Sequence, residues 1–245
     1  MALRPWSPIP IREAHEPLVA LPPALLRLEP HPYMVLGAPY GPEGQPFRLR
    51  QGVVDRLLLA QQALQADQAS LRLAIFDAWR PLAVQRFMVR HALESECVRL
   101  GVEPDLDSVQ RDQIVKEVGR FWAPPSEDPA TPPPHSTGAA VDLTLADHTG
   151  ALLAMGGDID AIGAVSEPEF HATAALVDPA GNAARWHRHR RLLAMVMTGA
   201  GFVQHPNEWW HFSWGDQLWA WRSGSAEAVY GRTEGDGEAE SSRNN

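Results

Sequence analysis

The sequence predicts an α+β fold in which a small antiparallel sheet is flanked by helices. Short segments that alternate like strands are interspersed with longer segments of helical period, without the regular alternation of strand and helix that is typical of a parallel sheet. The composition is globular, with 44% hydrophobic and 21% charged residues. A length of 245 residues allows one sizeable core, so we expect a single domain over residues 1–222.

The two ends of the chain differ from this domain in composition. Residues 1–48 contain many prolines and no sustained helical period, which predicts an extended arm that wraps the domain. Beyond Arg222 the chain is rich in Ser, Gly and Glu and offers little to bury. Residues 223–245 are therefore expected to form a polar, disordered tail.

Hydrophobic periodicity predicts the elements between these ends. A period near 3.6 indicates helices at 49–66, 84–100, 106–121 and 182–198. Alternation indicates strands at 71–77, 139–145, 151–155, 202–203 and 209–214. The second and third of these strands are expected to form a hairpin. Six prolines between residues 123 and 134 predict an irregular loop that leads to His135.

Charge and cysteine content restrict the partners and the chemistry. A net charge of −9 goes against sequence-independent binding of nucleic acid, which needs clustered Lys and Arg, and favours a small-molecule or peptide partner. The single cysteine, Cys97, allows neither an intramolecular disulfide nor a cysteine-based zinc cluster. Ligands for a metal must therefore come from His and carboxylate side chains.

No segment predicts contact with a membrane. The N-terminal residues lack the apolar stretch of a secretory signal, and no run approaches the ~18 apolar residues of a membrane span. We expect a cytoplasmic protein, with export by a separate route left open. The oligomeric state is also left open.

Two short motifs carry the candidate site. One is His135-Ser-Thr-Gly138-Ala-Ala-Val-Asp142, and the other is Glu208-Trp-Trp-His211. Two imidazoles and one carboxylate form the ligand set that holds catalytic zinc while a fourth position stays open. The motifs therefore predict one Zn²⁺ per chain, bound by His135, Asp142 and His211, with Glu208 as the base.

Strand geometry restricts how these residues can meet. In an uninterrupted strand, the separation of seven would place His135 and Asp142 on opposite faces of the sheet. A kink must intervene, and Gly138 can provide it through a positive φ or a bulge. Asp142 is then expected to point away from the core that Val141 and Leu143 enter.

The second motif is read in the same way. His211 is expected to share a face with Trp209, while Trp210 and Phe212 pack behind it. Glu208 then lies at the entrance of the strand, close to the metal without being a ligand.

The chemistry of such a site requires a base and a cation. Zinc lowers the pKa of bound water to roughly 7. Glu208 could accept the proton of the water and pass it to a leaving amine, a role worth about 10²–10⁴-fold in rate. Arg80, at the end of a predicted strand, is the candidate that stabilises the oxyanion.

Four ordered motifs resemble those of the zinc D-alanyl-D-alanine dipeptidases. This family includes the vancomycin-resistance dipeptidases and belongs with the D-Ala-D-Ala carboxypeptidases and hedgehog-type zinc domains. The resemblance covers about residues 8–221. It rests on Asp77-Ala-Trp-Arg80-Pro81, the His135 to Asp142 motif, Met155-Gly-Gly-Asp-Ile-Asp160 and Glu208-Trp-Trp-His211.

The resemblance implies a zinc-dependent dipeptidase that hydrolyses D-Ala-D-Ala or a similar free dipeptide in a small cavity of an α+β fold. The implied roles are zinc ligands for His135, Asp142 and His211, base for Glu208, transition-state stabiliser for Arg80, and binding of the substrate ammonium group for Asp160 and Tyr33.

One departure from the family concerns the substrate. Members commonly have Ser two positions before the first zinc His, where it helps to bind substrate, whereas this chain has Pro133. Proline offers neither a hydroxyl nor a backbone N–H. With Pro133 in place of this Ser, the resemblance does not imply a strict preference for D-Ala-D-Ala.

Alternatives remain for the function and for single residues. A D,D- or L,D-carboxypeptidase acting on longer cell-wall peptides, a non-catalytic zinc interaction module and a non-haem iron oxygenase are the other functions considered. The oxygenase has the weakest support, because its His and Asp ligands usually lie two residues apart. Arg80 could instead pair with Asp77, and Asp160 could cap a turn. His171 and His205 are expected at the surface, and residues 187–191 are expected to form a solvated basic face.

Overall fold

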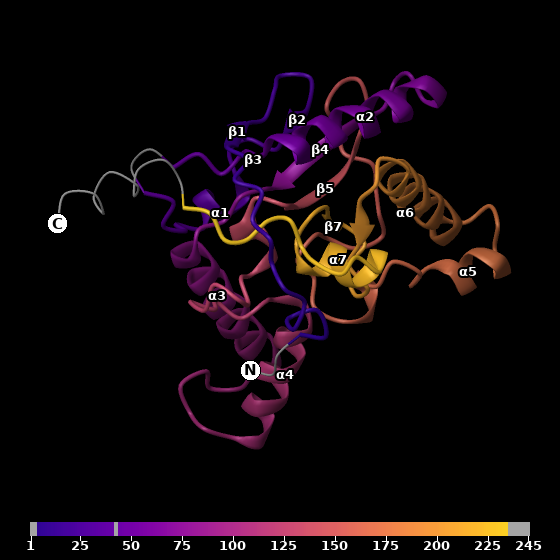
Figure 1. Cartoon of the computed structure of the whole chain (residues 1–245). Coiled ribbons are helices and arrows are strands. Elements are labelled where there is room, and N and C mark those ends of the chain that lie inside the picture. The colour runs from indigo at the N-terminus through magenta and orange to yellow at the C-terminus, as the bar shows by residue number, and fades with distance from the viewer. Residues whose placement is uncertain (1–3, 42–43, 235–245) are drawn as a thin grey trace.

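The structure, a computed structural model, describes residues 4–41 and 44–234. It has the predicted α+β architecture (Figure 1). The strands are β1 (Leu18–Ala20), β2 (Leu26–Arg27), β3 (Arg48–Arg50), β4 (Arg72–Asp77), β5 (Ala140–Ala146), β6 (Val203–Gln204) and β7 (His211–Ser213). The α-helices are α1 (Pro32–Val35), α2 (Gln51–Asp67), α3 (Leu82–Leu100), α4 (Val109–Phe121), α5 (Ala172–Val177), α6 (Asn182–Gly199) and α7 (Gln217–Ser223). Two 3₁₀ turns span Pro134–Thr137 and Ala164–Ser166.

The main sheet has the strand order β2-β4-β5-β7-β6. The neighbouring pairs are antiparallel, as predicted, except β2 and β4, which are parallel. The parallel strand comes from the N-terminal arm, which also contributes β1, β3 and α1. The predicted hairpin after β5 is reduced to one bridge between Ala146 and Leu152.

Helices α2 and α6 cover one face of the sheet and bury the main core. Alternate residues of β5, including Val141 and Leu143, enter this core, as predicted from their parity. Leu57 of α2 and Leu193 of α6 are fully buried against them. The opposite side chains of β5, such as Asp142, are thereby directed to the other face of the sheet.

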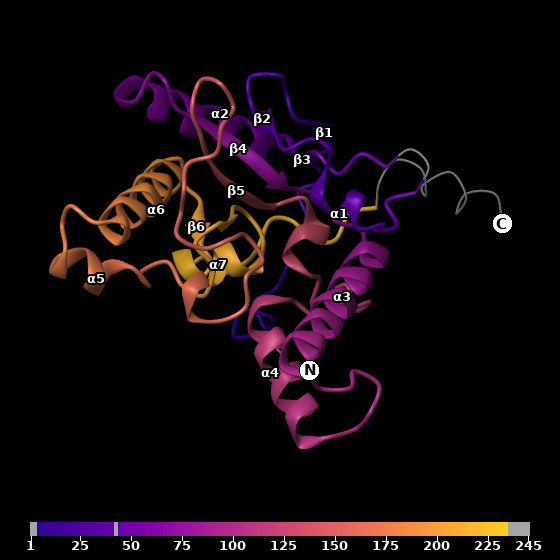
Figure 2. The same ribbon diagram turned by 180° about the vertical axis from the view of Figure 1, so that it is seen from behind.

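Helices α3 and α4 pack together below the sheet (Figure 2). Their buried apolar residues, among them Met88 and Val118, form a second cluster that includes Tyr33 of α1. Helix α4 begins three residues later than predicted, because the Ser108 hydroxyl caps it by accepting a hydrogen bond from the backbone N–H of Arg111 at 3.1 Å.

The packed part of the chain extends beyond residue 222. Ala228 and Tyr230 are fully buried, and Ala228 pairs with Ile11 of the N-terminal arm. The hydroxyl of Tyr230 donates a hydrogen bond to Glu16 at 2.7 Å. The predicted boundary at residue 222 is therefore too early. The tail prediction for residues 235–245 lies outside the described residues.

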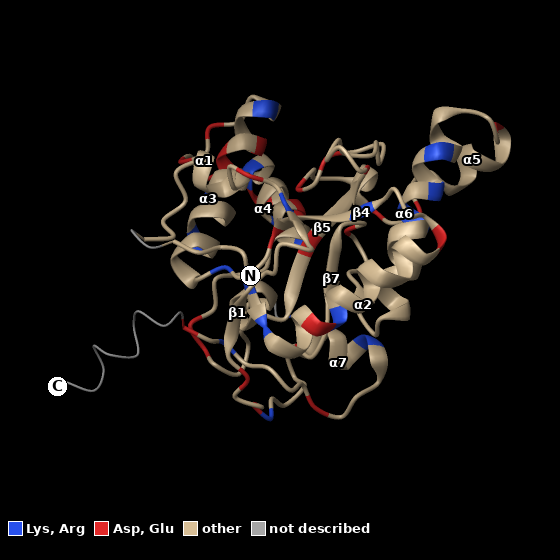
Figure 3. Cartoon of the chain, turned by 90° about the horizontal axis from the view of Figure 1, so that it is seen from above, with Lys and Arg blue, Asp and Glu red and all other residues tan. Residues whose placement is uncertain are grey.

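Figure 3 shows that Lys, Arg, Asp and Glu residues occur on several elements of the fold. Within the described ranges, no helix is both long and apolar enough to cross a membrane.

The expectation of a solvated basic face at residues 187–191 is wrong for Arg190, which is buried. Its guanidinium donates hydrogen bonds to the backbone oxygens of Met155, Val165 and Glu167, each at 2.8 or 2.9 Å. Arg190 thereby fixes the loop that carries Asp160.

Candidate metal centre and active site

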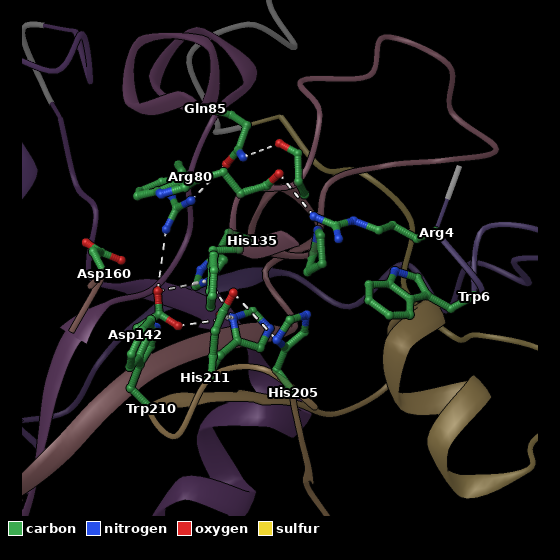
Figure 4. A pocket seen from close by; sticks show the side chains of 15 residues that line it. Arg4, Trp6, Arg80, Gln85, His135, Asp142, Asp160, His205, Trp210 and His211 are labelled. Carbon is green, nitrogen blue, oxygen red and sulfur yellow. Dashed lines mark hydrogen bonds and ion pairs between the residues drawn. The ribbon is translucent and has the colours of Figure 1, made fainter. Parts of the chain in front are cut away.

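The structure brings together the three predicted metal ligands (Figure 4). His135 comes from the 3₁₀ turn, Asp142 from β5 and His211 from β7. Nε2 of His135 lies 3.2 Å from Oδ2 of Asp142, and Nδ1 of His211 lies 3.1 Å from Oδ1 of the same carboxylate. The two facing imidazole nitrogens are 3.2 Å apart. Three donor atoms therefore converge on one point.

Local backbone geometry explains this convergence. Gly138 ends the 3₁₀ turn with φ of 70°, which is the kink expected between His135 and Asp142. A Cβ at this position would lie 2.4 Å from Cδ2 of Leu18, so a larger residue would also clash. Asp142 and His211 are direct partners in the register of β5 and β7, and their side chains therefore share a face.

The ligand atoms fit a divalent metal such as zinc. All three residues are buried, and Oδ1 of Asp142 has no hydrogen-bond partner among the described residues. The Nδ1–H of His135 donates to the backbone oxygen of Ala78 at 2.7 Å, so in the neutral tautomer Nε2 is the nitrogen that can bind a metal. Burial would raise the pKa of Asp142, but the two adjacent imidazoles outweigh it and hold that pKa well below its usual range.

A second carboxylate, Asp77, lies behind the ligands. A β-bulge near the end of β4 places Asp77, instead of Phe76, opposite Asp142. Oδ2 of Asp77 lies 3.4 Å from Nδ1 of His135, and Oδ1 accepts hydrogen bonds from His31 and Tyr40, both at 3.1 Å. Asp77 is fully buried, so these donors compensate the loss of hydration.

Arg80 lies at the corner between β4 and α3, as predicted. Its Nη2 and Nε donate to Oδ2 of Asp77 at 2.7 and 3.0 Å, and its Nη1 donates to Gln85 at 2.8 Å. Nη2 also lies 3.5 Å from Oδ2 of Asp142. Two alternatives were considered for Arg80: an ion pair with Asp77, and a position beside the metal ligands. The structure shows both.

Glu208 lies beside His211, at the entrance of β7. Its Oε2 is 3.6 Å from Nδ1 of His211, and its Oε1, which has no hydrogen-bond partner among the described residues, is 3.5 Å from Nδ1 of His205. Burial, together with the negative charges of Asp142 and Asp160, raises the pKa of Glu208 well above its usual value. A raised pKa suits a group that must both accept and release a proton.

His205 is a site residue that sequence reasoning missed. It was expected at the surface but is buried beside Glu208, and burial and the nearby His211 lower its pKa well below the usual value. The sequence contains no local signal for this placement, because the contacts come from the folded loop before β7. The surface expectation is also wrong for His171, whose ring is buried and hydrogen-bonded to the backbone oxygen of Gly156 at 2.9 Å.

Asp160 and Tyr33 meet on the other side of the ligands. The Tyr33 hydroxyl donates to Oδ2 of Asp160 at 2.8 Å and accepts a hydrogen bond from Arg80 at 3.3 Å. Asp160 has φ of 66°, an uncommon conformation for a residue other than glycine. Burial, followed by the charge of Asp142, raises the pKa of Asp160 to about 7.

The three metal ligands line a small cavity of about 40 Å³ together with Arg80, Asp160, His205 and Glu208. On the same measure one water needs about 10–15 Å³, so the cavity admits only small groups. Trp210 belongs to the main core, as predicted, and also contributes to the lining of the cavity. The N-terminal arm contributes Arg4 and Trp6, two lining residues that sequence reasoning missed.

Comparisons with known proteins identify the family of this chain. The family model described as D-ala-D-ala dipeptidase matches residues 27–227. The chain is 42% identical to the D-alanyl-D-alanine dipeptidase of Synechocystis sp. over 95% of this chain and 98% of that protein. It is 31% identical to the Escherichia coli D-alanyl-D-alanine dipeptidase over 63% of this chain and 61% of that protein.

Among solved structures, the chain is similar to a zinc-bound variant of the vancomycin resistance D,D-pentapeptidase VanY. The TM-score is 0.46 and the sequences are 14% identical, with 89% of this chain and 95% of that chain covered. The extent of the family match and the identity to the Synechocystis protein leave no support for an iron oxygenase. The chain belongs to the D-ala-D-ala dipeptidase family of metallopeptidases.

Proposed function

We propose that the protein is a zinc-dependent dipeptidase that hydrolyses D-Ala-D-Ala or a similar free dipeptide of cell-wall metabolism. The observation that carries the proposal is the place of Glu208, a buried carboxylate 3.6 Å from one of three converging ligands. One Zn²⁺ held by His135, Asp142 and His211 would polarise the scissile carbonyl and lower the pKa of a water molecule to roughly 7.

The side chains around the metal ligands have the remaining catalytic roles. Glu208 takes the proton from the attacking water and later gives it to the leaving amine. Arg80 directs a guanidinium fixed by Asp77 toward the oxygen that gains negative charge. Asp77 also lies behind His135 and helps to hold the ring in the orientation that the ligand set requires.

The opposite end of the cavity selects a free amine. The carboxylate of Asp160 and the hydroxyl of Tyr33 provide acceptors for a substrate ammonium group. A pKa near 7 lets Asp160 ionise as the positive group arrives. An acylated amine would bring no charge to this carboxylate, so we propose that the site excludes peptides with further residues on that side.

A hydrolysis panel tests the proposal. Zinc-loaded protein is incubated with D-Ala-D-Ala, the mixed-chirality dipeptides and N-acyl-D-Ala-D-Ala, and released D-alanine is measured. We expect turnover of free dipeptides and little of the acylated peptide. Preferred turnover of the acylated peptide would instead indicate a carboxypeptidase, and no turnover of any substrate would indicate a non-catalytic zinc module.

Asp160→Asn gives a separate prediction on the metal-free protein. An ordinary Asp titrates near 3.9, so a pKa of about 7 means that the folded state binds more protons between about pH 4 and pH 7. The free energy of unfolding of the wild type should therefore fall, relative to the Asn variant, as the pH rises through this range. Denaturant unfolding of both proteins at pH 5 and pH 8 checks this, and a constant difference would contradict it.

A further inference from the structure

The N-terminal arm places one cation at the cavity. Arg4 lines the cavity, where its guanidinium donates to the backbone oxygens of Arg120 at 3.3 Å and Trp122 at 3.0 Å. These carbonyls lie at the end of α4, so the arm is fastened there. Figure 4 shows Arg4 on one side of the metal ligands and Asp160 on the other. The cavity therefore has a cationic end and an anionic end.

Arg4 is partly buried and differs from Arg80, the other guanidinium group that lines the cavity. Arg80 is neutralised by Asp77. Among residues 4–41 and 44–234, by contrast, no carboxylate forms an ion pair with Arg4. A guanidinium has five N–H donors, and the two backbone carbonyls accept from two of its nitrogens, which leaves further N–H groups for a ligand.

Solvation and charge also favour an anion at this place. Burial lowers the pKa of Arg4, and the charge of Glu208 acts in the opposite direction, so the guanidinium already experiences the electrostatics of the site. A cation that has lost part of its hydration without forming an ion pair is stabilised by a bidentate carboxylate. Such an anion would lie at the end of the cavity away from Asp160.

Pro133 leaves a need for such a donor. It offers neither a hydroxyl nor an N–H to a substrate, and its own carbonyl accepts from Ser136. We propose that Arg4 binds the C-terminal carboxylate of the substrate. This inference rests on the proposed dipeptidase function and deepens it, because Asp160 and Arg4 then recognise the two charged ends of one short peptide.

The test compares Arg4→Gln with the wild type on D-Ala-D-Ala and on D-Ala-D-alaninamide, which lacks the carboxylate. We expect Arg4→Gln to raise KM for D-Ala-D-Ala about 10- to 100-fold, as for the loss of a charged hydrogen bond, with little change in kcat. KM for the amide should be the same in both proteins. Arg12→Gln is the matched control, because Arg12 lies in the same arm but is 81% exposed and pairs with Glu227.

A second readout separates this inference from the proposed function. Calorimetric binding of the dipeptide and its amide is measured in a zinc-loaded Glu208→Gln background, with and without Arg4→Gln. One outcome is that the wild type fails to hydrolyse dipeptides while the difference between dipeptide and amide binding still depends on Arg4. This result would support the carboxylate site and contradict the proposed dipeptidase activity. If Arg4→Gln weakened the binding of dipeptide and amide equally, or weakened neither, the proposed role of Arg4 would be wrong. Arg4 would then serve only to hold the N-terminal arm against α4.

Discussion

Glu208→Gln is expected to lower kcat about 10²–10⁴-fold while the protein keeps its full zinc content. Gln has nearly the same shape and can still contact His205 and His211, which lie 3.5 and 3.6 Å from the carboxylate oxygens. It cannot accept the proton of the water. Steady-state hydrolysis of D-Ala-D-Ala and metal analysis of the same preparation provide the measurement.

His211→Ala is the matched comparison. It removes one of the three converging donor atoms, so we expect loss of both zinc and activity. Equal loss of zinc in the two variants would show that Glu208 is a ligand or a structural support. Nearly unchanged kcat in Glu208→Gln would show that another group is the base.

Arg80→Met is expected to affect both folding and catalysis. Asp77 is fully buried, and the variant leaves its carboxylate without the cation that lies 2.7 Å away. Breaking a buried pair in this way costs about 3–5 kcal/mol in the free energy of unfolding. Loss of an oxyanion donor should lower kcat about 10²–10³-fold. Denaturant unfolding and steady-state kinetics measure the two effects.

The double variant Asp77→Asn with Arg80→Met separates these effects. Asn can still accept hydrogen bonds from His31 and Tyr40 but has no charge to compensate, so most of the lost stability should return. Activity should remain low, because the guanidinium is still absent. Recovery of kcat in the double variant would mean that Arg80 serves only as the partner of Asp77.

The local part of the site could be predicted from the sequence. Parity alone requires a kink between His135 and Asp142, and Gly138 provides it with a positive φ. Alternation in β5 likewise predicts which side chains enter the core and which face the ligands. These features depend on neighbouring residues, so periodicity and turn preferences are enough to find them.

The remaining parts depend on contacts between distant segments. Asp77 reaches the site through a bulge in the pairing of β4 with β5, which no local pattern marks. Arg4 reaches it because carbonyls at the end of α4 hold the arm. The same applies to Tyr230, whose burial depends on the N-terminal arm. Helix α7 was not predicted, although Asp is a common N-cap residue and Asp216 caps this helix by accepting a hydrogen bond from the backbone N–H of Trp219 at 2.8 Å.

A zinc titration of metal-free protein tests the central claim most directly. Chelator-treated protein receives increasing zinc, and the release of D-alanine from D-Ala-D-Ala is followed at each addition. With one site formed by His135, Asp142 and His211, activity should be absent without metal, rise linearly and level off at one equivalent per chain. Hydrolysis that persists after chelation, or no hydrolysis at any zinc concentration, would contradict the account.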